Sequence, residues 1–308
     1  MTLSAARFPR KSTAIDKRRM QAKLMRYLPA YVSARLPMLA MLAGLGVASP
    51  PSPAAEPACG PYQLAYFEFG SFYYKNEKDD YVGIDKDVVV ELARRSGCVL
   101  NGFLDSRVRT WTHLADGALD MSVSAIPTPE REKFAVFIPY YQSRNYVLMR
   151  KDAESSPTSL RDFLDNPTLR LAVVKSFKHG TTLDAWIDEL RAQQRVDDYA
   201  DTELAARALA FRRADAILSQ PVVWAPLIKR NKLEGKLVFH DWASADRVPG
   251  ALVLSKSRVS ATDIQRIRKH IEAMRADGTL ERIFARHVPK DIVQQLLLPP
   301  ERSEAPRK

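Results

Sequence analysis

The chain has 308 residues, of which 27% are charged and 46% hydrophobic, a globular composition sufficient for two domains. The formal net charge of +11 would suggest nucleic-acid binding if it were spread over the fold, but nine lysines and arginines and a single acid lie in residues 1–54. Residues 55–308 carry only +3. We therefore do not infer nucleic-acid binding.

The N-terminal segment has the pattern of an export signal. Its basic run ends at Arg35, and thirteen uncharged and mostly apolar residues follow at 36–48. That run is too short for a comfortable membrane span and suits the hydrophobic part of a signal peptide. Small residues then offer cleavage after Ala54, with Ala55 as the alternative. We expect residues 1–54 to be removed and the mature protein to be soluble in the periplasm.

Two cysteines, Cys59 and Cys98, remain in the exported chain. An even pair in an oxidising compartment is typical of a disulfide rather than of a metal or catalytic site. Cys59 precedes an expected strand and Cys98 opens another one after a helix. Because two such strands are often neighbours in a β-α-β unit, we expect a disulfide between them. Two unrelated thiols are the alternative.

Strands and helices alternate along the first part of the mature chain, which predicts an α/β fold with mostly parallel sheets flanked by helices. The expected elements are a strand at 63–69, a helix at 85–97 capped by Asp85, a strand at 98–104, a helix at 110–117, a strand at 119–126 and a helix start at 128.

The second part repeats this alternation. Its expected elements are a strand at 170–176, a helix at 181–194, a strand at 196–200, a helix at 201–213 and strands at 214–219 and 236–242. Strand-like segments at 145–152 and 250–257 connect the two parts, and helices at 261–278 and 279–288 end the fold. The charged, proline-containing C-terminus predicts a disordered tail at 297–308.

The helix start at 128 raises a question of charge. Thr128 is the expected N-cap and Pro129 the first helical position. Arg131 then lies in the first turn, where the helix dipole disfavours a cation by up to about 1 kcal/mol. A bound anion would explain Arg131, because free backbone N–H groups and a guanidinium both bind one. The alternative is a solvated arginine whose small cost is tolerated.

The position of this helix start also predicts a cleft. Open parallel sheets bind ligands beyond the carboxyl ends of their strands. The Arg131 helix start lies at such an end in the first part, and the loop at 175–182 lies at one in the second. Two such edges that face each other would form a cleft closed by a hinge.

Several segments, in order over about residues 60–290, give the chain a family resemblance. They are YVGIDKDVVVELARRSG, the W-x-x-L-x-x-G-x-x-D pattern from Trp111, TPEREKFAVFIPYY, LAVVKSFKHGTT, RRADAIL and RADGTLERIFARH. The chain resembles the periplasmic solute-binding proteins of family 3, which serve polar amino acid ABC transporters. The resemblance implies a type II periplasmic-binding-protein fold with two lobes joined by two strand-like hinge crossings. Lobe 1 would comprise 55–146 and 247–296, and lobe 2 would comprise 147–246.

The resemblance also implies roles for individual residues of the first lobe. Arg131 corresponds to the guanidinium that holds the ligand's α-carboxylate, which agrees with the dipole argument. Ser124 corresponds to a position whose hydroxyl or backbone meets the ligand. Phe69 corresponds to an aromatic residue that stacks on the ligand, and Trp111 to a second aromatic wall.

In the second lobe, Gly180, Thr181 and Thr182 match the helix start that closes on the carboxylate, and free N–H groups there would favour an anion. Two positions depart from the family pattern. Ile126 stands where the family usually has Ser or Thr, and Gln220 stands where an amino-acid binder has the aspartate that holds the α-ammonium. A neutral amide does not neutralise a buried ammonium. We therefore expect an organic anion, or an amino acid held unusually.

The sequence shows no metal or cofactor site. No two of its five histidines share metal-ligand spacing, and it has neither a phosphate loop nor an H-E-x-x-H motif. His179 and Glu68 are the acid–base candidates that can be placed in the cleft. A solvated loop histidine and a solvent-facing glutamate are the alternatives.

These features together favour an exported, monomeric solute-binding protein without catalytic activity, which delivers a small carboxylate-bearing solute to an ABC permease in the inner membrane. A periplasmic enzyme on the same scaffold, similar to the dehydratases that resemble this family, is one alternative. A ligand sensor or accessory protein with another membrane partner is a second one, which the sequence does not separate from the transport protein.

Overall fold

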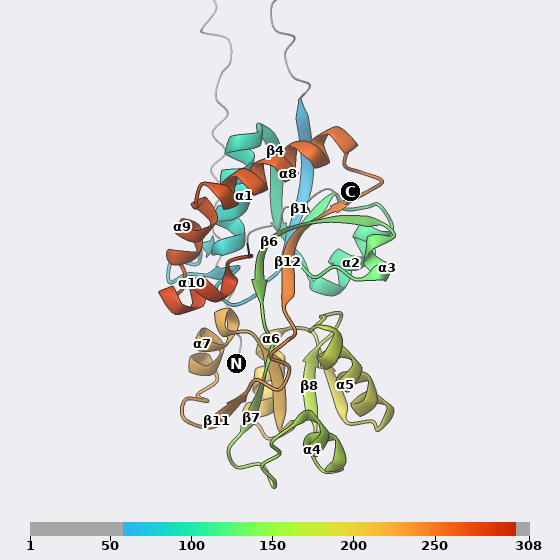
Figure 1. Ribbon diagram of the computed structural model, residues 1–308, viewed down its shortest axis with the longest axis vertical. Coiled ribbons are helices and arrows are strands. Elements are labelled where there is room, and N and C mark those ends of the chain that lie inside the picture. Colours follow the sequence, from blue (N-terminus) through green and yellow to red (C-terminus); the bar gives the residue numbers. More distant parts are fainter. Residues whose placement is uncertain (1–57, 300–308) are drawn as a thin grey trace, which may run out of the picture. The chain divides into compact units, whose positions relative to one another are not determined.

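The structure, a computed structural model, describes residues 58–299. The predicted signal peptide lies outside the described residues, as do all but the first three residues of the predicted tail. Residues 58–299 form two five-stranded sheets with helices packed on them and a small hairpin, β2 (Tyr74–Lys75) with β3 (Tyr81–Val82) (Figure 1). Within this range no helix is long and apolar enough to cross a membrane.

The first sheet combines parallel and antiparallel strands in the order β4–β1–β5–β12–β6. Strand β1 lies parallel to β4 and β5, whereas β12 lies antiparallel to β5 and β6. The strands are β1 (Cys59–Tyr66), β4 (Cys98–Leu104), β5 (Met121–Ala125), β6 (Ala135–Ser143) and β12 (Val248–Ser255).

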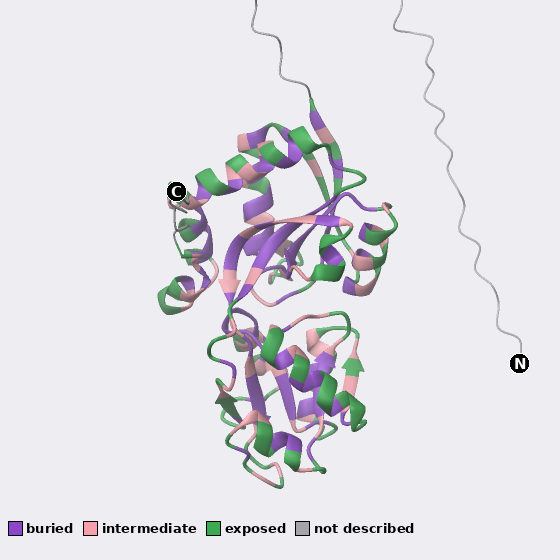
Figure 2. Ribbon diagram, turned by 45° about the vertical axis from the view of Figure 1, so that its right-hand side comes forward, coloured by how far each residue is buried: buried purple, intermediate pink, exposed green. Residues whose placement is uncertain are grey.

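Six helices belong to the first sheet. They are α1 (Ile84–Ser96), α2 (Arg107–Ala115), α3 (Pro129–Glu132), α8 (Ala261–Ala276), α9 (Thr279–Ala285) and α10 (Lys290–Leu296). Apolar side chains at helical spacing pack these helices against the first sheet and against one another. In α8 the buried stripe consists of Ile264, Ile267, Ile271 and Met274, which recur every three or four residues. Figure 2 shows the result, with mostly buried strands and helices that expose one face.

The second sheet has the order β11–β7–β10–β8–β9. Strand β8 lies parallel to β9 and β10, whereas β7 lies antiparallel to β10 and β11. The strands are β7 (Tyr146–Arg150), β8 (Leu171–Val174), β9 (Val196–Tyr199), β10 (Ala216–Ser219) and β11 (Leu237–His240). The helices are α4 (Leu160–Asp165), α5 (Thr181–Ala192), α6 (Thr202–Ala210) and α7 (Pro221–Arg230).

The chain passes between the two sheets twice. It leaves β6 after Ser143 and enters β7 at Tyr146, and it leaves β11 after His240 and enters β12 at Val248. The end of the first sheet's outgoing strand pairs with the start of its returning strand, Ser143 with Val248. The predicted two-lobe α/β fold with two crossings is therefore confirmed. The predicted lobe limits at 146–147 and 246–247 stay a prediction.

Helix α1 begins one residue earlier than predicted, and Asp85 is not its cap. The N-cap is Gly83, with φ of 137° and no side-chain cap. A Cβ atom at Gly83 would lie 2.3 Å from the carbonyl oxygen of Phe72, so only glycine fits there. The Asp85 side chain points instead into the core, where it is fully buried.

Three further helices differ from the sequence prediction. Helix α2 begins at Arg107 rather than at Thr110, because Ser106 acts as its N-cap and accepts a hydrogen bond from the Arg109 N–H at 3.3 Å. Helices α7 and α10 are not predicted at all, and the interior Pro226 of α7 is a residue that sequence patterns associate with a break in a helix. The proline that begins α7 is tolerated, since the first helical position needs no N–H partner.

The disulfide prediction is confirmed. Cys59 and Cys98 face each other in the register of the parallel strands β1 and β4, with a Cα–Cα distance of 4.4 Å. Both residues are buried. The bond therefore ties the first strand of the fold to the strand that follows α1.

Loops of the two sheets touch beside the start of α7. The Ser71 N–H donates a hydrogen bond to the carbonyl of Val222 at 3.1 Å. Gly70 has φ of 52°, and a Cβ atom there would lie 2.5 Å from the Cα of Val223. A neighbouring ring contact joins Phe69 to Phe177 at 5.3 Å between centroids. Gly70 thus permits an approach that any side chain would block.

Removing the disulfide should lower the stability of the fold. The Cys59→Ala/Cys98→Ala variant should lose about 2 to 4 kcal/mol of unfolding free energy, because the bond closes a long loop in the unfolded chain. Urea denaturation of the two proteins measures the difference. Reductant should destabilise the wild type and leave the double variant unchanged. A variant as stable as the oxidised wild type would contradict this role for the bond.

Gly70→Ala should keep the two sheets apart in solution, because its Cβ would clash with the backbone of Val223. Gly97→Ala is the matched control, since Gly97 also has positive φ but a Cβ there meets nothing within 4 Å. Both variants carry the strain of a left-handed alanine, about 1 to 2 kcal/mol. Small-angle scattering should give a larger radius of gyration for Gly70→Ala only. Equal radii for the two variants would refute the steric argument.

Candidate functional site

Arg131 lies where loops of the two sheets meet. Helix α3 begins as predicted, with the Thr128 hydroxyl accepting a hydrogen bond from the Arg131 N–H at 3.3 Å. The guanidinium lies 3.7 Å from the centroid of the Trp111 ring and donates to the carbonyls of Ile126 and Ser176, both at 2.8 Å. Ser176 belongs to the second sheet's loop, so Arg131 connects the two sheets.

Arg131 is buried without a carboxylate in direct contact, although the charges of Asp184 and Glu130 act on it from a distance and partly offset the effect of burial. The residue is 9% exposed, and burial lowers its pKa to about 10. Within the described residues it forms no ion pair with a carboxylate. Two carbonyl oxygens offset the charge less than a carboxylate would. The assignment of Arg131 as the carboxylate clamp stays a prediction.

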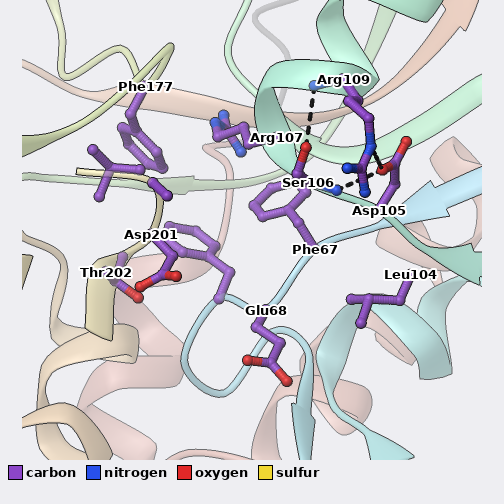
Figure 3. A pocket seen from close by; sticks show the side chains of 13 residues that line it. Phe67, Glu68, Leu104, Asp105, Ser106, Arg107, Arg109, Phe177, Asp201 and Thr202 are labelled. Carbon is purple, nitrogen blue, oxygen red and sulfur yellow. Dashed lines mark hydrogen bonds and ion pairs between the residues drawn. The ribbon is translucent and has the colours of Figure 1, made fainter. Parts of the chain in front are cut away.

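Arg107, which sequence reasoning missed, lies beside the same loop. Its guanidinium stands between the rings of Phe67 and Phe177, 4.3 and 4.4 Å from their centroids (Figure 3). The residue is 5% exposed, and its Nε and Nη2 atoms are buried without a hydrogen-bond partner among the described residues. Burial, followed by the nearby charge of Arg131, lowers the pKa of Arg107 to about 9.

The signal that could have found Arg107 was present in the sequence. Arg107 is the first residue of α2, directly after the N-cap Ser106. A cation at that position is disfavoured by the helix dipole, as it is for Arg131. The sequence interpretation places the helix start at Thr110 and therefore does not register the conflict.

A cavity of about 300 Å³ opens between the two sheets at Arg107. Its apolar walls include Phe67, Phe69 and Phe177. Figure 3 shows Arg107 between two of these rings and the acidic side chains of Glu68 and Asp201 on the opposite side of the space. Both acids are exposed, so they do not require a partner as a buried charge does.

A second, much smaller cavity of about 10 Å³ shares Phe69 and Phe177 with the first. It is lined by His179, Ser219 and Gln220, each at least nine-tenths buried. The His179 Nε2, Ser219 Oγ and Gln220 Oε1 atoms have no hydrogen-bond partner among the described residues. A space of this size holds about one water molecule.

His179 is neutral because burial lowers its pKa to about 3. The Asn145 amide donates to the His179 carbonyl at 3.0 Å, so the Asn145 Oδ1 atom faces the His179 Nδ1 atom at 3.3 Å. We infer that Nδ1 carries the proton and that Nε2 is an acceptor. The small cavity therefore presents neutral acceptors to a hydroxyl, an amine or a water.

The predicted anion-binding start of α5 contacts the protein's own carboxylate. Gly180 is the N-cap and Thr181 the first helical residue. The Thr182 N–H and hydroxyl donate to Asp246 at 2.8 and 3.0 Å, and Asp246 lies in the segment that returns the chain to the first sheet. The glycine leaves room for this contact, since a Cβ on Gly180 would lie 2.8 Å from the carboxylate.

Ser124 takes part in a buried network in the first sheet. Its hydroxyl donates to Asp85, with contacts of 2.8 and 3.0 Å to the two carboxylate oxygens. The Tyr140 hydroxyl donates to the same carboxylate at 2.5 Å. Burial raises the pKa of Asp85 to about 7 against the lowering effect of these bonds and of Arg107. The Ser124 hydroxyl is thus already engaged within the protein.

The structure brings only some of the predicted ligand residues together. Phe69 and Gln220 line the cavities, whereas Arg131 and Trp111 form a stacked pair beside the loop that contains Ser176 and Phe177. Among residues 58–299 no cluster of histidine, cysteine and acidic side chains is arranged to hold a metal ion.

Asp85 and His179 give the stability of the fold opposite pH dependences. The folded-state pKa of Asp85, about 7, lies above its ordinary 3.8, so its contribution falls as the pH rises from about 4 to 7. The folded-state pKa of His179, about 3, lies below its ordinary 6.5, so its contribution falls as the pH falls from about 6.5 to 3. The two effects oppose each other in the wild type.

Removing either group should expose the pH dependence of the other. In Asp85→Asn the unfolding free energy should rise by about 3 kcal/mol between pH 4 and 6.5, because Asp85 no longer opposes the titration of His179. In His179→Gln it should fall over the same interval. Urea denaturation at a series of pH values measures both slopes. The proposed titrations are wrong if both variants keep the wild-type profile.

Known structures share this fold. An ancestral arginine-binding protein bound to arginine has a TM-score of 0.61 and 20% identity, covering 74% of this chain and 98% of its own. A histidine kinase sensor domain with similarity to periplasmic binding proteins has a TM-score of 0.64 and 15% identity, covering 77% and 97%. AncCDT-1, an ancestral amino acid-binding protein and precursor of cyclohexadienyl dehydratase, has a TM-score of 0.60 and 19% identity, covering 74% and 95%.

The sequence itself gives a more specific result. None of the curated proteins matches it. Residues 67–290, which include both sheets' loops around Arg107 and Arg131, match the bacterial extracellular solute-binding proteins of family 3. This match extends over most of the chain and agrees with the two-sheet fold. The chain therefore belongs to family 3 of the bacterial extracellular solute-binding proteins.

Proposed function

We propose that this protein is exported, binds a small carboxylate-bearing solute, an organic acid or an amino acid, between its two sheets and delivers it to an ABC transporter. One observation carries the proposal. Arg107 and Arg131 are buried guanidiniums at the junction of the two sheets, and neither forms an ion pair with a carboxylate within residues 58–299.

The energetics of burial support an anionic solute. A buried charge without a charged partner costs several kcal/mol relative to the same charge in water. The lowered pKa values of Arg107 and Arg131 express this cost. A carboxylate bound between the sheets would offset it with charge-assisted hydrogen bonds, which are about twice as strong as neutral ones.

Binding without chemistry is favoured over catalysis. An enzyme on this scaffold needs an acid or base in the cavity. His179 is neutral and buried, so it is a poor proton donor near neutral pH. Glu68 is exposed and accepts a hydrogen bond from the Tyr81 hydroxyl at 3.1 Å. Neither side chain has the environment expected of a catalytic acid.

The transport role is favoured by the solved relatives. One of them is the substrate-binding protein of an amino acid ABC transporter, with a TM-score of 0.59. The sensor-domain relative supports a second candidate function, that of a sensor. In that role the protein binds the same solute and the solute-bound form is recognised by another membrane protein. The two roles share one binding event and differ only in what recognises the solute-bound protein.

A carboxylate should stabilise the mature protein against heat and denaturant. At 100 times its dissociation constant, a solute adds about 2.7 kcal/mol. We would screen carboxylic acids and the twenty amino acids by thermal shift, with their amides and neutral sugars as controls, and confirm binding by calorimetry. At least one carboxylate should bind and its amide should not. Binding confined to the neutral controls would refute the proposal.

A further inference from the structure

We infer that Arg107 is a second anion-binding residue of this site, so that the solute is a small dicarboxylate with one carboxylate at Arg131 and the other at Arg107. This inference rests on the proposed function and names the class of solute. It begins from the difference between Arg107 and a structural arginine of the same protein.

Arg195 shows how this fold satisfies a buried arginine. It is 4% exposed, comparable to Arg107 at 5%. Its guanidinium donates to the carbonyls of Phe163, Leu164 and Leu169 at 2.7 to 2.8 Å. Arg107 donates to nothing among the described residues, and two of its nitrogens are sealed from solvent. The rings that stack on Arg107 do not replace these hydrogen bonds, and each unmade hydrogen bond of a buried arginine is costly.

The rings around Arg107 prepare it for a planar anion. Phe67 and Phe177 cover the two faces of the guanidinium, which leaves its N–H groups directed outward in the plane. The unpartnered Nε and Nη2 atoms belong to one edge, the geometry that binds both oxygens of a carboxylate. Phe177 comes from the second sheet's loop, so separation of the sheets would open this edge before the solute binds.

The two guanidiniums are close enough for one small solute to reach both. Arg131 donates to the carbonyl of Ser176, and Arg107 stacks on the next residue, Phe177. A single negative charge would leave one of the two buried cations uncompensated. The buried Asp85 offsets Arg107 only in part, because it forms no ion pair with the guanidinium and its pKa of about 7 leaves it partly protonated near neutral pH. Two carboxylates on one solute would compensate both arginines.

Asp105 lines the larger cavity with a side chain that is 7% exposed, but its carboxylate is already paired with the Arg109 guanidinium at 2.6 Å, so the walls offer no unpaired buried negative charge for an ammonium group. Gln220, His179 and Ser219 are neutral. Of the acids at the larger cavity, Glu68 and Asp201 are exposed and bonded to the Tyr81 hydroxyl and the Leu204 N–H. The neutral acceptors of the small cavity suit a hydroxyl or a water beside the carboxylates.

The test compares succinate, glutarate and adipate with their monoamides, which have the same length and one charge less. Calorimetry of the wild type should show at least one dicarboxylate binding about 100-fold more tightly than its monoamide. This is the difference expected when the second carboxylate forms a bidentate ion pair with Arg107. Arg107→Met should reduce this preference to a few-fold, and Arg107→Lys should give an intermediate preference. Arg94→Met, which removes an exposed arginine paired with Glu91, should leave it unchanged.

Stability separates a binding role from a structural one. Arg107→Met should raise the melting temperature of the free protein, because it removes an uncompensated buried charge. Arg195→Met should lower it, because three carbonyls lose their donor. A lower melting temperature for Arg107→Met would identify Arg107 as structural and overturn the inference.

The outcomes also separate this inference from the proposed function. Equal affinity of the wild type for a dicarboxylate and its monoamide would overturn the second anion site while leaving carboxylate binding intact. Unchanged discrimination in Arg107→Met would do the same. If no carboxylate, with one charge or two, binds the wild type, the proposed function itself fails.

Discussion

The structure depends on the burial of two like charges where its two sheets meet. Arg107 and Arg131 are both buried, and Arg131 lies near enough to Arg107 to lower its pKa. Burial of a guanidinium is tolerated when carbonyls or aromatic rings surround it, and the protein uses both. Arg131 has Trp111 and two carbonyls, whereas Arg107 has rings alone.

Internal contacts take positions that a solute's carboxylates could occupy. The Ser176 carbonyl accepts from Arg131, and the Asp246 carboxylate accepts from the Thr182 backbone and hydroxyl. Binding energy is then a difference between solute contacts and these internal ones. The Asp246 carboxylate already makes charge-assisted hydrogen bonds with the Thr182 N–H and hydroxyl, so a solute carboxylate gains little by replacing it. The arginines, whose internal partners are neutral, are where a carboxylate gains most.

The sequence predicts what is determined locally. The Thr128 cap, the following proline and the first-turn arginine are a short-range pattern, and α3 has this form. The two-lobe fold follows from the alternation of strands and helices and from family segments. The cap was wrongly assigned to Asp85 because the helix start is set by Gly83 packing against Phe72, a contact between residues eleven positions apart with the β2–β3 hairpin between them.

Other features of the site lie beyond local pattern altogether. Asp246 and Thr182 are 64 residues apart, and no periodicity links them. Arg107 is different, because its conflict with the helix dipole is as visible in sequence as that of Arg131. The error there was a helix boundary, which single-sequence reasoning places only to within a few residues. Because the start of α2 was predicted at Thr110, Arg107 was not recognised as a first-turn cation.

The distribution of charge in the junction explains why the inner cavity is neutral. A protonated histidine beside two guanidiniums would add a third positive charge, and burial together with the Arg107 charge lowers the pKa of His179. Gln220, which stands where the family resemblance implies an aspartate, adds no negative charge to the positive field of the arginines. The neutral amide and the neutral imidazole therefore keep both arginines available to an anion while still offering acceptors to its polar substituents.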